Sequence, residues 1–331
     1  MKREQISIPG TAADFEPGEH RDSMCAYRSD DRAVTLYLAD CLAVIERLPA
    51  ESVDVVWADP PYFLSGGGST CRGGQRASVD KGKWDAPSTV AGMHAWNKAW
   101  LMACRRVLKP TGTLWACGNR HNIHSLGFAM QELGYRGLND VTWQKPNPPP
   151  NLGCRTLTDD AETILWASRD RKARHIFNYA AMRAENGGKQ MKTTWRFPPP
   201  TGDEVKHGRY PTQKPVALIR RALRASLPVD GTVLDPFMGS GTAGVAAREL
   251  GAKYIGIDLS DEAVKLAVTR ITETPASPRV EVPDMTAYAA LCDLCDEMPY
   301  DEFATMMRDL QVIQRHRTEA EMVRELAGSQ V

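Results

Sequence analysis

Short apolar runs alternate along the chain with segments in which apolar residues recur every three or four positions. The apolar runs predict buried strands at residues 34–39, 53–58, 112–117, 138–143, 163–167, 232–237 and 254–258. The segments with helical spacing predict helices at residues 41–48, 95–108, 123–133, 215–226, 243–250 and 260–272. This alternation predicts an α/β fold with a mostly parallel, doubly wound sheet of about seven strands.

Three segments interrupt the alternation of strands and helices. Residues 1–32 are polar without a sustained period, which predicts a poorly ordered arm. The glycine-rich segment 65–88 is long for a loop and predicts a mobile, functional loop within residues 63–95. Residues 168–210 are basic and proline-rich, so we interpret them as an insertion rather than a further α/β repeat.

The carboxy-terminal residues 281–331 predict an acidic helical extension. Apolar residues recur there at helical spacing, which is typical of a helix packed on the body of the protein or on a second copy. The α/β domain then consists of residues 33–150 and 211–280, with the variable region 151–210 between its two halves.

The chain has 331 residues and no net charge, but the charge is unevenly distributed. Residues 281–331 carry a net charge of −7, which leaves +7 on the rest of the chain. Residues 167–210 hold ten Arg and Lys against four Asp and Glu. A basic body beside an acidic tail is compatible with a surface that faces DNA.

The sequence also bears on location and metal content. No run of about 18 apolar residues occurs, and the first residues lack an apolar core, so neither a transmembrane helix nor a secretory signal is predicted. Eight irregularly placed cysteines fit a reducing cytoplasm. Cys292 and Cys295 have no second ligand pair, which favours helical packing over a zinc site. We expect a cytoplasmic protein without a metal.

Residues 239–244, with the sequence GSGTAG, stand between a predicted strand and a predicted helix. Glycines there allow a tight turn and a close approach to a ligand, and the helix N-terminus offers free N–H groups. Asp258 ends the next strand and is placed to accept from ribose hydroxyls. The pattern alone leaves open a nicotinamide dinucleotide, S-adenosylmethionine (AdoMet) and a packing turn.

Residues beside this glycine loop favour AdoMet. Asp235 ends the preceding strand, where a carboxylate receives an ammonium group but repels a pyrophosphate. Thr212, Gln213 and Lys214 lie upstream and can reach a carboxylate. The methionine part of AdoMet carries both an ammonium group and a carboxylate, and the loop also lies far from the N-terminal position usual in a dehydrogenase.

The predicted strand 53–58 is followed by Asp59, Pro60, Pro61 and Tyr62. The two prolines fix the backbone and remove two N–H donors, which leaves a rigid turn rich in acceptors. The Asp59 carboxylate and the Pro60 carbonyl can accept both hydrogens of an amino group, and Tyr62 can stack on a flat base. The pattern indicates a pocket for the exocyclic amine of a nucleobase, with a merely stiffened turn as the alternative.

Together these motifs resemble those of the DNA amino-methyltransferases. The motifs are DPPY at 59–62, TWQKPNPPP at 142–150, PTQKP at 211–215 and DPFMGSGT at 235–242. Their order, with DPPY first, a variable region next and the AdoMet loop last, resembles the circularly permuted beta group of N6-adenine and N4-cytosine enzymes. The resemblance covers about residues 33–272 and implies a Rossmann-like AdoMet-dependent methyltransferase fold.

The resemblance also implies roles for individual residues. Asp59, Pro60, Pro61 and Tyr62 would form the catalytic set. Asp40 would contact the adenine amine of AdoMet, and Asp258 would contact its ribose hydroxyls. Thr212, Gln213 and Lys214 would hold its carboxylate. The methionine part would be surrounded by Asp235, Pro236, Phe237, Gly239, Ser240, Gly241 and Thr242, and Asp59 would also contact the cofactor. The family often carries Glu where Asp258 stands.

In this family the target-recognition region lies between the two motif halves, here at about 151–210. The residues expected to contact DNA are Arg72, Arg76, Lys145, Arg169, Arg171, Lys172, Arg174, Arg183, Lys189, Lys192 and Arg196. Trp143 is a candidate for packing against a flipped base, and a core tryptophan is the alternative.

The sequence therefore predicts an AdoMet-dependent, site-specific methyltransferase for the exocyclic amine of adenine in duplex DNA. Methyl transfer would be direct, without a metal or a covalent enzyme–base intermediate. Alternatives are a cytosine-N4 methyltransferase and a catalytically idle DNA-binding regulator that keeps AdoMet. A homodimer and a cognate restriction endonuclease are possible partners, and no membrane contact is expected.

Overall fold

A computed structural model describes residues 24–63, 89–151, 153–172 and 174–276, together with the backbone of strands β4 (Ser69–Arg72) and β5 (Gln75–Ser78). Contacts divide the chain into two units, Met1–Val280 and Glu281–Val331. The predicted helical extension with Cys292 and Cys295, most of the predicted arm and most of the predicted loop lie outside the described residues.

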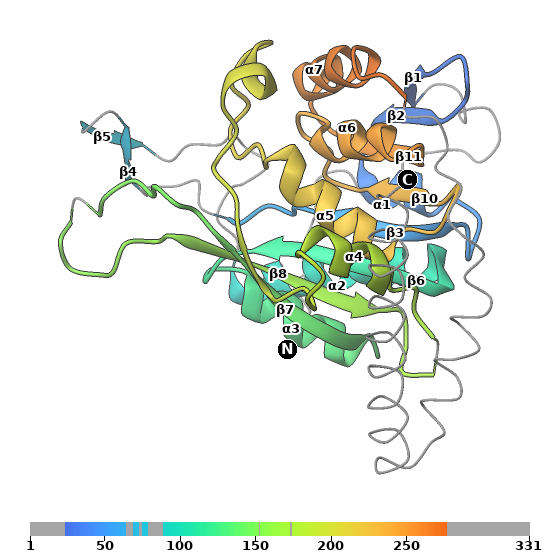
Figure 1. The fold of residues 1–331 in the computed structure, drawn as a ribbon, viewed down its shortest axis with the longest axis horizontal. Coiled ribbons are helices and arrows are strands. Elements are labelled where there is room, and N and C mark those ends of the chain that lie inside the picture. The colour runs from blue at the N-terminus through green and yellow to red at the C-terminus, as the bar shows by residue number, and fades with distance from the viewer. Residues whose placement is uncertain are drawn as a thin grey trace, which may run out of the picture. The chain divides into compact units, whose positions relative to one another are not determined.

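A nine-stranded sheet with the order β1-β2-β11-β10-β3-β6-β8-β7-β9 forms the centre of the first unit (Figure 1). The strands from β2 to β6 in this order are parallel, and β8 runs antiparallel to both of its neighbours. The strands are β1 (Cys25–Arg28), β2 (Val34–Leu38), β3 (Val53–Ala58), β6 (Leu108–Gly118), β7 (Arg136–Gln144), β8 (Ala161–Ser168), β9 (Thr194–Arg196), β10 (Thr232–Asp235) and β11 (Lys253–Asp258).

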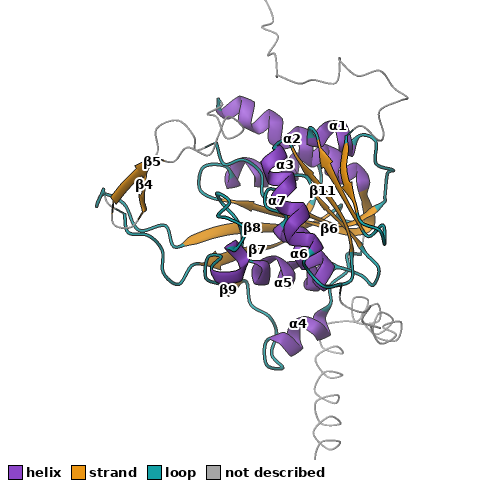
Figure 2. Cartoon of the chain, turned by 90° about the horizontal axis from the view of Figure 1, so that it is seen from above, coloured by secondary structure: helices purple, strands orange, loops and turns teal. Residues whose placement is uncertain are grey.

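Helices cover both faces of this sheet. They are α1 (Cys41–Ile45), α2 (Val90–Val107), α3 (Ile123–Glu132), α4 (Tyr179–Glu185), α5 (Val216–Ser226), α6 (Thr242–Glu249) and α7 (Asp261–Thr272). One buried cluster joins the first three helices to the sheet, and a second joins the last four to its other face (Figure 2). The predicted doubly wound, mostly parallel α/β fold is therefore confirmed.

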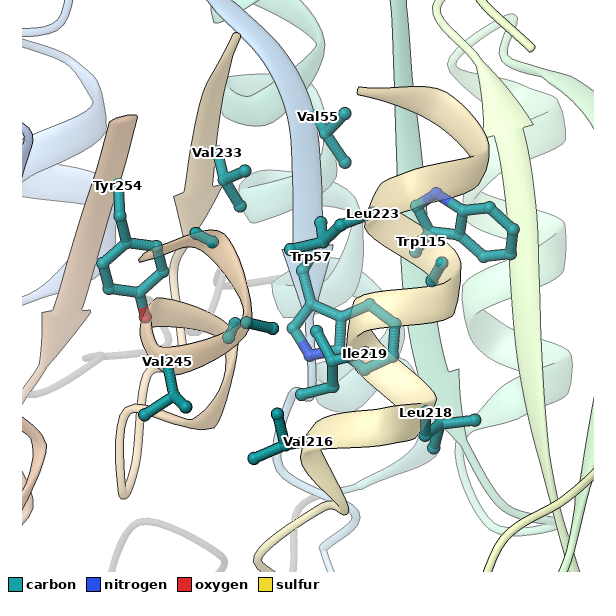
Figure 3. Close-up of a cluster of buried hydrophobic side chains, with 14 of the residues drawn as sticks. Val55, Trp57, Trp115, Val216, Leu218, Ile219, Leu223, Val233, Val245 and Tyr254 are labelled. Atoms are coloured by element: carbon teal, nitrogen blue, oxygen red, sulfur yellow. The ribbon is translucent and has the colours of Figure 1, made fainter. Parts of the chain in front are cut away.

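Helix α5 illustrates how the sequence pattern produces this packing. Val216, Ile219 and Leu223 recur at helical spacing, and all three are buried. Figure 3 shows them facing Trp57 on strand β3, which is itself 1 % exposed. Burying a large apolar side chain contributes about 1.5–3 kcal/mol, so this row fixes α5 against the sheet.

The main differences from the prediction lie where elements are short. Strand β1 falls within the predicted arm and pairs antiparallel with β2. Helix α4 and strand β9 lie in the segment interpreted as an insertion, and only the middle residue of β9, Trp195, is buried. Such short strands, with at most one buried position, give no readable period, so pairing with an existing sheet edge decides their structure.

Three further features differ from the predicted boundaries. Strand β8 belongs to the central sheet although it lies within the region 151–210. Helix α2 begins at Val90, inside the predicted loop 63–95, where the Thr89 side chain caps it. Strands β4 and β5 pair as an antiparallel hairpin in that loop. Among the helices that the structure describes, none has the length and apolar character needed to cross a bilayer.

Candidate active site

Four neighbouring parallel strands lead to an aspartate at the same edge of the sheet. Asp258 and Asp235 are the last residues of β11 and β10, Asp59 follows β3 directly, and Asp40 follows β2 by two residues. The chain continues from β10 into α6 on one face and from β3 toward α2 on the other. Open α/β sheets bind ligands at such a topological switch point.

The turn after β3 holds its tyrosine in place. Tyr62 is 6 % exposed, and its Oη lies 2.9 Å from Asp59 Oδ1 and 3.0 Å from Glu162 Oε2. The Asn122 side chain donates to the Pro61 carbonyl at 3.4 Å. Burial, followed by the charges of Asp59 and Glu162, raises the pKa of Tyr62 well above its ordinary value, so its hydroxyl remains a proton donor.

Two lysines and two carboxylates surround this hydroxyl. Lys214 Nζ lies 2.5 Å from Asp59 Oδ2 and 3.4 Å from Glu162 Oε2, and the lysine side chain is 5 % exposed. Lys145 Nζ lies 2.6 Å from Glu162 Oε1. The two positive and two negative charges balance, which permits this much charge in a buried place.

The pKa values follow from these pairs. Burial raises the pKa of Glu162, but Lys214 and Lys145 outweigh it and lower the pKa to about 2. Burial alone would lower the pKa of Lys214, yet Asp59 and Glu162 raise it above its ordinary value. Glu162 is therefore ionised and Lys214 protonated at neutral pH.

The glycine loop after β10 has backbone angles that favour glycine. Gly239 has a φ of 50° and Gly241 a φ of 74°. A Cβ atom on Gly241 would lie 2.6 Å from the Cβ of Ala267 on α7, so this glycine also permits close packing. A Cβ on Gly239 would lie 3.0 Å from the ring of Tyr210, which lies beside the loop.

Buried Arg270 fixes the other side of the loop. Its Nη1 donates to the Ser240 carbonyl at 2.7 Å, to Ser240 Oγ at 2.9 Å and to Thr242 Oγ1 at 2.9 Å. The hydroxyl oxygens of Ser240 and Thr242 thus accept from a residue of α7. Their predicted contact with the methionine part of AdoMet stays a prediction.

An aromatic group lies beside the loop and the DPPY turn. Phe237 contacts Trp100 edge-on at a centroid distance of 5.3 Å and Trp96 at 5.4 Å. Trp96 in turn contacts Phe63, the residue after Tyr62, at 5.8 Å. Residues of α2 and of the turns after β3 and β10 thus form one apolar wall, and Pro236, next to Phe237 in the chain, is buried.

Asp258 and Asp40 accept hydrogen bonds from backbone N–H groups at the same edge of the sheet. Asp258 accepts from the backbone N–H groups of Gly239 at 2.7 Å and Ser260 at 2.8 Å. Asp40 caps α1 by accepting from Leu42 and Ala43. Asp258 therefore links strand β11 to the glycine loop, and each acid retains acceptor capacity for a ligand.

Asp235 is 3 % exposed and accepts from Tyr254 Oη at 3.1 Å and from the Phe237 N–H at 3.1 Å. Burial, which is only partly offset by these hydrogen bonds, raises the pKa of Asp235 to about 8. No cation from the described residues is among the causes that set this pKa. A buried carboxyl of this kind at a glycine loop fits the ammonium group of AdoMet.

Replacing Asp235 with Asn is expected to flatten the pH dependence of stability. Because the folded-state pKa of about 8 exceeds the ordinary 3.8, the native state binds the extra proton between these values, and the free energy of unfolding falls as pH rises through them. The amide of the Asp235→Asn variant has no proton to lose there. Urea unfolding at pH 5 and pH 8 should show a decline in the wild type that is smaller in Asp235→Asn by about 1 kcal/mol or more. An equal decline in both proteins contradicts this assignment.

Thr212, Gln213 and Lys214 occupy a turn that precedes α5. Thr212 is exposed and has a φ of 68°, whereas the buried Gln213 Oε1 has no hydrogen-bond partner among the described residues. Gln213 Nε2 donates to the Glu204 carbonyl at 2.8 Å. The structure brings the Lys214 ammonium group to Asp59 and Glu162, and its predicted role at the AdoMet carboxylate stays a prediction.

The residues predicted to contact DNA fall into four groups, the last of which is Lys145 alone. Arg169, Arg171, Lys172 and Arg174 follow the end of β8, which because of its antiparallel direction lies at the opposite edge of the sheet from Asp59. The Arg169 side chain there pairs with Glu51 at 2.6 Å. The structure does not bring these four residues to the candidate site.

Arg196 ends β9 beside Gln144, the last residue of β7, and is exposed at the site edge. Lys189 and Lys192 are exposed shortly before it, and the Arg183 guanidinium donates to the Gly188 carbonyl. The side chains of Arg72 and Arg76 lie outside the described residues.

Two residues of the TWQKPNPPP segment turn inward. Trp143 is 3 % exposed, and its indole N–H donates to the Phe197 carbonyl at 2.9 Å, as expected of the core-tryptophan alternative. Lys145, predicted to contact DNA, is paired with Glu162 instead. The Glu162 carboxylate needs a compensating positive charge, which explains why the Lys145 side chain turns toward it.

Sequence reasoning missed several residues of the site, above all Glu162, Arg270, Tyr254 and Asn122. Glu162 stands near the start of an apolar strand, and an acid in such a run was the available signal. Arg270 and Tyr254 lie in an ordinary helix and strand, and only their contacts reveal them. Among the described residues, no group of three or more His, Cys, Asp or Glu side chains is arranged to hold a metal ion.

Comparisons with known proteins agree with this geometry. The family model N6_N4_Mtase, described as DNA methylase, matches residues 53–269. The chain is 46 % identical over 248 residues to the type II methyltransferase M2.LlaDCHI of Lactococcus lactis subsp. cremoris, covering 75 % of this chain and 92 % of that protein. It is 47 % identical over 234 residues to M2.DpnII of Streptococcus pneumoniae, covering 70 % and 87 % respectively.

Solved structures share the fold at lower identity. The complex of M1.HpyAVI with SAM has a TM-score of 0.51 at 23 % identity and covers 72 % of this chain and 99 % of that one. The cytosine-N4-specific PvuII DNA methyltransferase has a TM-score of 0.58 at 19 % identity and covers 74 % and 88 %. The chain belongs to the DNA methylase family of N6 and N4 methyltransferases. It is an AdoMet-dependent DNA methyltransferase, as its motifs predict.

Proposed function

We propose that this enzyme methylates the N6 amine of adenine, flipped out of duplex DNA, at a specific sequence. The observation that carries the proposal is the position of the Asp59–Tyr62 turn on β3, directly beside the glycine loop on β10. An amine acceptor and a cofactor loop on adjacent parallel strands place the two reactants at one edge of the sheet.

The turn supplies the groups that an exocyclic amine requires. Its nitrogen lone pair is delocalised into the base, so the amine is a poor nucleophile until its hydrogens are held. The Asp59 carboxylate and the Pro60 carbonyl accept these two hydrogens and direct the lone pair toward the methyl group. Lys214 Nζ lies over the Tyr62 ring at 5.3 Å from its centroid, so the base would stack on the opposite face of that ring.

AdoMet, when bound, supplies a methyl group on a positively charged sulfur. Asp235 would receive its ammonium group, the backbone of Gly239 to Thr242 would surround its methionine part, and Phe237 would pack beside it. Asp258 would accept from its ribose hydroxyls and Asp40 from its adenine amine. Thr212 and Gln213 remain for its carboxylate, since Lys214 is already paired with Asp59.

The duplex is proposed to lie along the site edge, where Arg196 is exposed at the end of β9. Lys189 and Lys192 are exposed before the start of β9, and their contacts with DNA stay a prediction from the sequence. We also propose, from the sequence, that the enzyme acts in the cytoplasm, and a cognate restriction endonuclease is a candidate partner. A homodimer remains part of the proposal, with residues 281–331 as its candidate surface.

Cytosine-N4 methylation is the second candidate, because the PvuII enzyme has a similar fold and a cytosine amine presents the same two hydrogens. Asp rather than Ser before Pro60 and Pro61 favours adenine in the resembling family. Plasmid DNA methylated by the purified enzyme and sequenced with a modification-sensitive readout tests the proposal. N6-methyladenine at one recurring sequence is expected, and N4-methylcytosine or unmodified DNA would overturn it.

A further inference from the structure

Glu162 is a buried acid that none of the recognised motifs contains. It is the second residue of β8, the antiparallel strand beside β6, and its side chain is 15 % exposed. One carboxylate oxygen, Oε1, accepts from Lys145 at 2.6 Å. The other, Oε2, faces Tyr62 and Lys214. Such a group costs free energy to bury, so its place beside Asp59 calls for a role.

Both donors that contact Asp59 also reach Glu162. Tyr62 Oη is 2.9 Å from Asp59 Oδ1 and 3.0 Å from Glu162 Oε2. Lys214 Nζ is 2.5 Å from Asp59 Oδ2 and 3.4 Å from Glu162 Oε2. Each donor is therefore shared between two carboxylates, and Glu162 Oε2 is the alternative acceptor for both.

This sharing affects how well Asp59 can accept a further hydrogen bond. The Tyr62 hydroxyl has one proton to donate, and the Lys214 ammonium group lowers the basicity of the Asp59 oxygen that it contacts. While Tyr62 and Lys214 donate to Asp59, both Asp59 oxygens already have a donor. Each oxygen keeps a further lone pair for an arriving amine, but the donors already bound make it a weaker acceptor. A second carboxylate within reach allows both donors to move by a short distance without losing a charged partner.

We propose that Glu162 is a positioning residue for methyl transfer, which takes over the Tyr62 hydroxyl and the Lys214 ammonium group when the target amine binds to Asp59. This inference rests on the proposed function of Asp59 as the amine acceptor. Lys145 holds the far oxygen of Glu162 and so directs Oε2 toward the two donors. The strongly lowered pKa of Glu162 keeps it ionised for this task.

The test compares Glu162→Gln, Glu162→Asp and Glu185→Gln by single-turnover methyl transfer at saturating AdoMet and DNA. The Glu162→Gln side chain keeps the shape but not the charge, so the rate should fall on the order of ten- to a hundredfold. The Glu162→Asp side chain keeps the charge at a shorter reach, so this variant should be faster than Glu162→Gln. Glu185, which pairs with Arg221 on the far helices, receives the same chemical change in Glu185→Gln, and this variant should transfer at the wild-type rate.

AdoMet affinity and the unfolding midpoint separate positioning from general damage. We expect Glu162→Gln to bind AdoMet as the wild type does while its transfer rate falls. If Glu162→Gln does not fold, the test rests on Glu162→Asp, whose shorter side chain is not expected to support the full wild-type rate with the wild-type pH dependence. Finding both in Glu162→Asp would then overturn the inference. Equal rates for Glu162→Gln and Glu185→Gln, or no gain of Glu162→Asp over Glu162→Gln, would overturn the inference.

Failure of the proposed function gives a different result. If the wild type methylates cytosine, the adenine proposal fails, while the effect of Glu162 on a cytosine amine is still measured by the same variants. If the wild type transfers no methyl group to DNA, both fail together. If the wild type methylates adenine and Glu162→Gln does so equally fast, only the role of Glu162 is rejected.

Discussion

Replacing Asp59 with Asn is expected to lower the rate of methyl transfer by at least about a hundredfold while AdoMet still binds. The amide has no charge and one acceptor oxygen in place of two, so it cannot hold the amine and retain Lys214 together. Its shape is nearly that of Asp, and the glycine loop on β10 is untouched. Single-turnover transfer to DNA and AdoMet titration of the same preparation measure the two effects.

Asp261→Asn is the matched control for this change. Asp261 is exposed in the first turn of α7 and, within the part of the chain that the structure describes, pairs only with Lys265, four residues on. Its replacement should leave transfer at the wild-type rate, because water screens an exposed pair of this kind. Asp59→Asn with wild-type transfer would refute the amine-acceptor role. A wild-type protein that binds AdoMet and DNA without methylating would instead indicate a regulator.

Replacing Lys214 with Met should lower the free energy of unfolding by about 3–5 kcal/mol, more than any other substitution that we propose. The variant retains Asp59 and Glu162 beside one hydroxyl, with Lys145 as the remaining cation of the cluster. Removing one member of a buried charge cluster leaves the others uncompensated. Urea unfolding at neutral pH measures the loss directly.

The loss caused by Lys214→Met should become smaller as pH falls. Lys214 lowers the pKa of Glu162, so Glu162 takes up a proton at a higher pH in the variant than in the wild type. In the wild type the folded-state pKa of about 2 lies below the ordinary 4.5, so the stability from Glu162 is present above pH 4.5 and is lost toward pH 2. A loss that stays constant down to pH 4 contradicts the charge argument.

Lys206→Met is the control for this second prediction. Lys206 pairs with Glu273 at 2.7 Å, but 53 % of its side chain is exposed, and His207 contacts the same carboxylate. Water screens such a pair, so its removal should change the free energy of unfolding far less than removal of Lys214 does. If Lys206→Met and Lys214→Met lost a similar free energy of unfolding, the burial of Lys214 could not be the reason for its contribution to stability.

The elements with the clearest patterns were predictable from the chain. Strand β3 is buried at every position and stands out as an apolar run interrupted only by Asp54. Helix α5 repeats Val216, Ile219 and Leu223 on one face, which fixes both its type and its orientation. The short strands β1 and β9 were not predictable, because they form by pairing with an edge that other segments create.

The order of the strands explains which site residues the sequence brings together. Asp59, Asp235 and Asp258 each end a parallel strand, so any parallel arrangement places them at one edge. Arg169 also follows a strand, but β8 runs antiparallel, which moves that arginine to the opposite edge. The direction of strand β8, which no local sequence pattern specifies, thus determines that Arg169 lies at the edge of the sheet opposite the site.

The sequence by itself determined the reaction class, because the DPPY turn and the glycine loop are contiguous motifs whose chemistry is set by neighbouring residues. Only the tertiary structure decided how their charges are compensated. Lys214 is 155 positions from Asp59, and Glu162 is 100 positions from Tyr62. Buried charges must find partners wherever the fold supplies them, so these contacts depend on strand order and not on spacing along the chain.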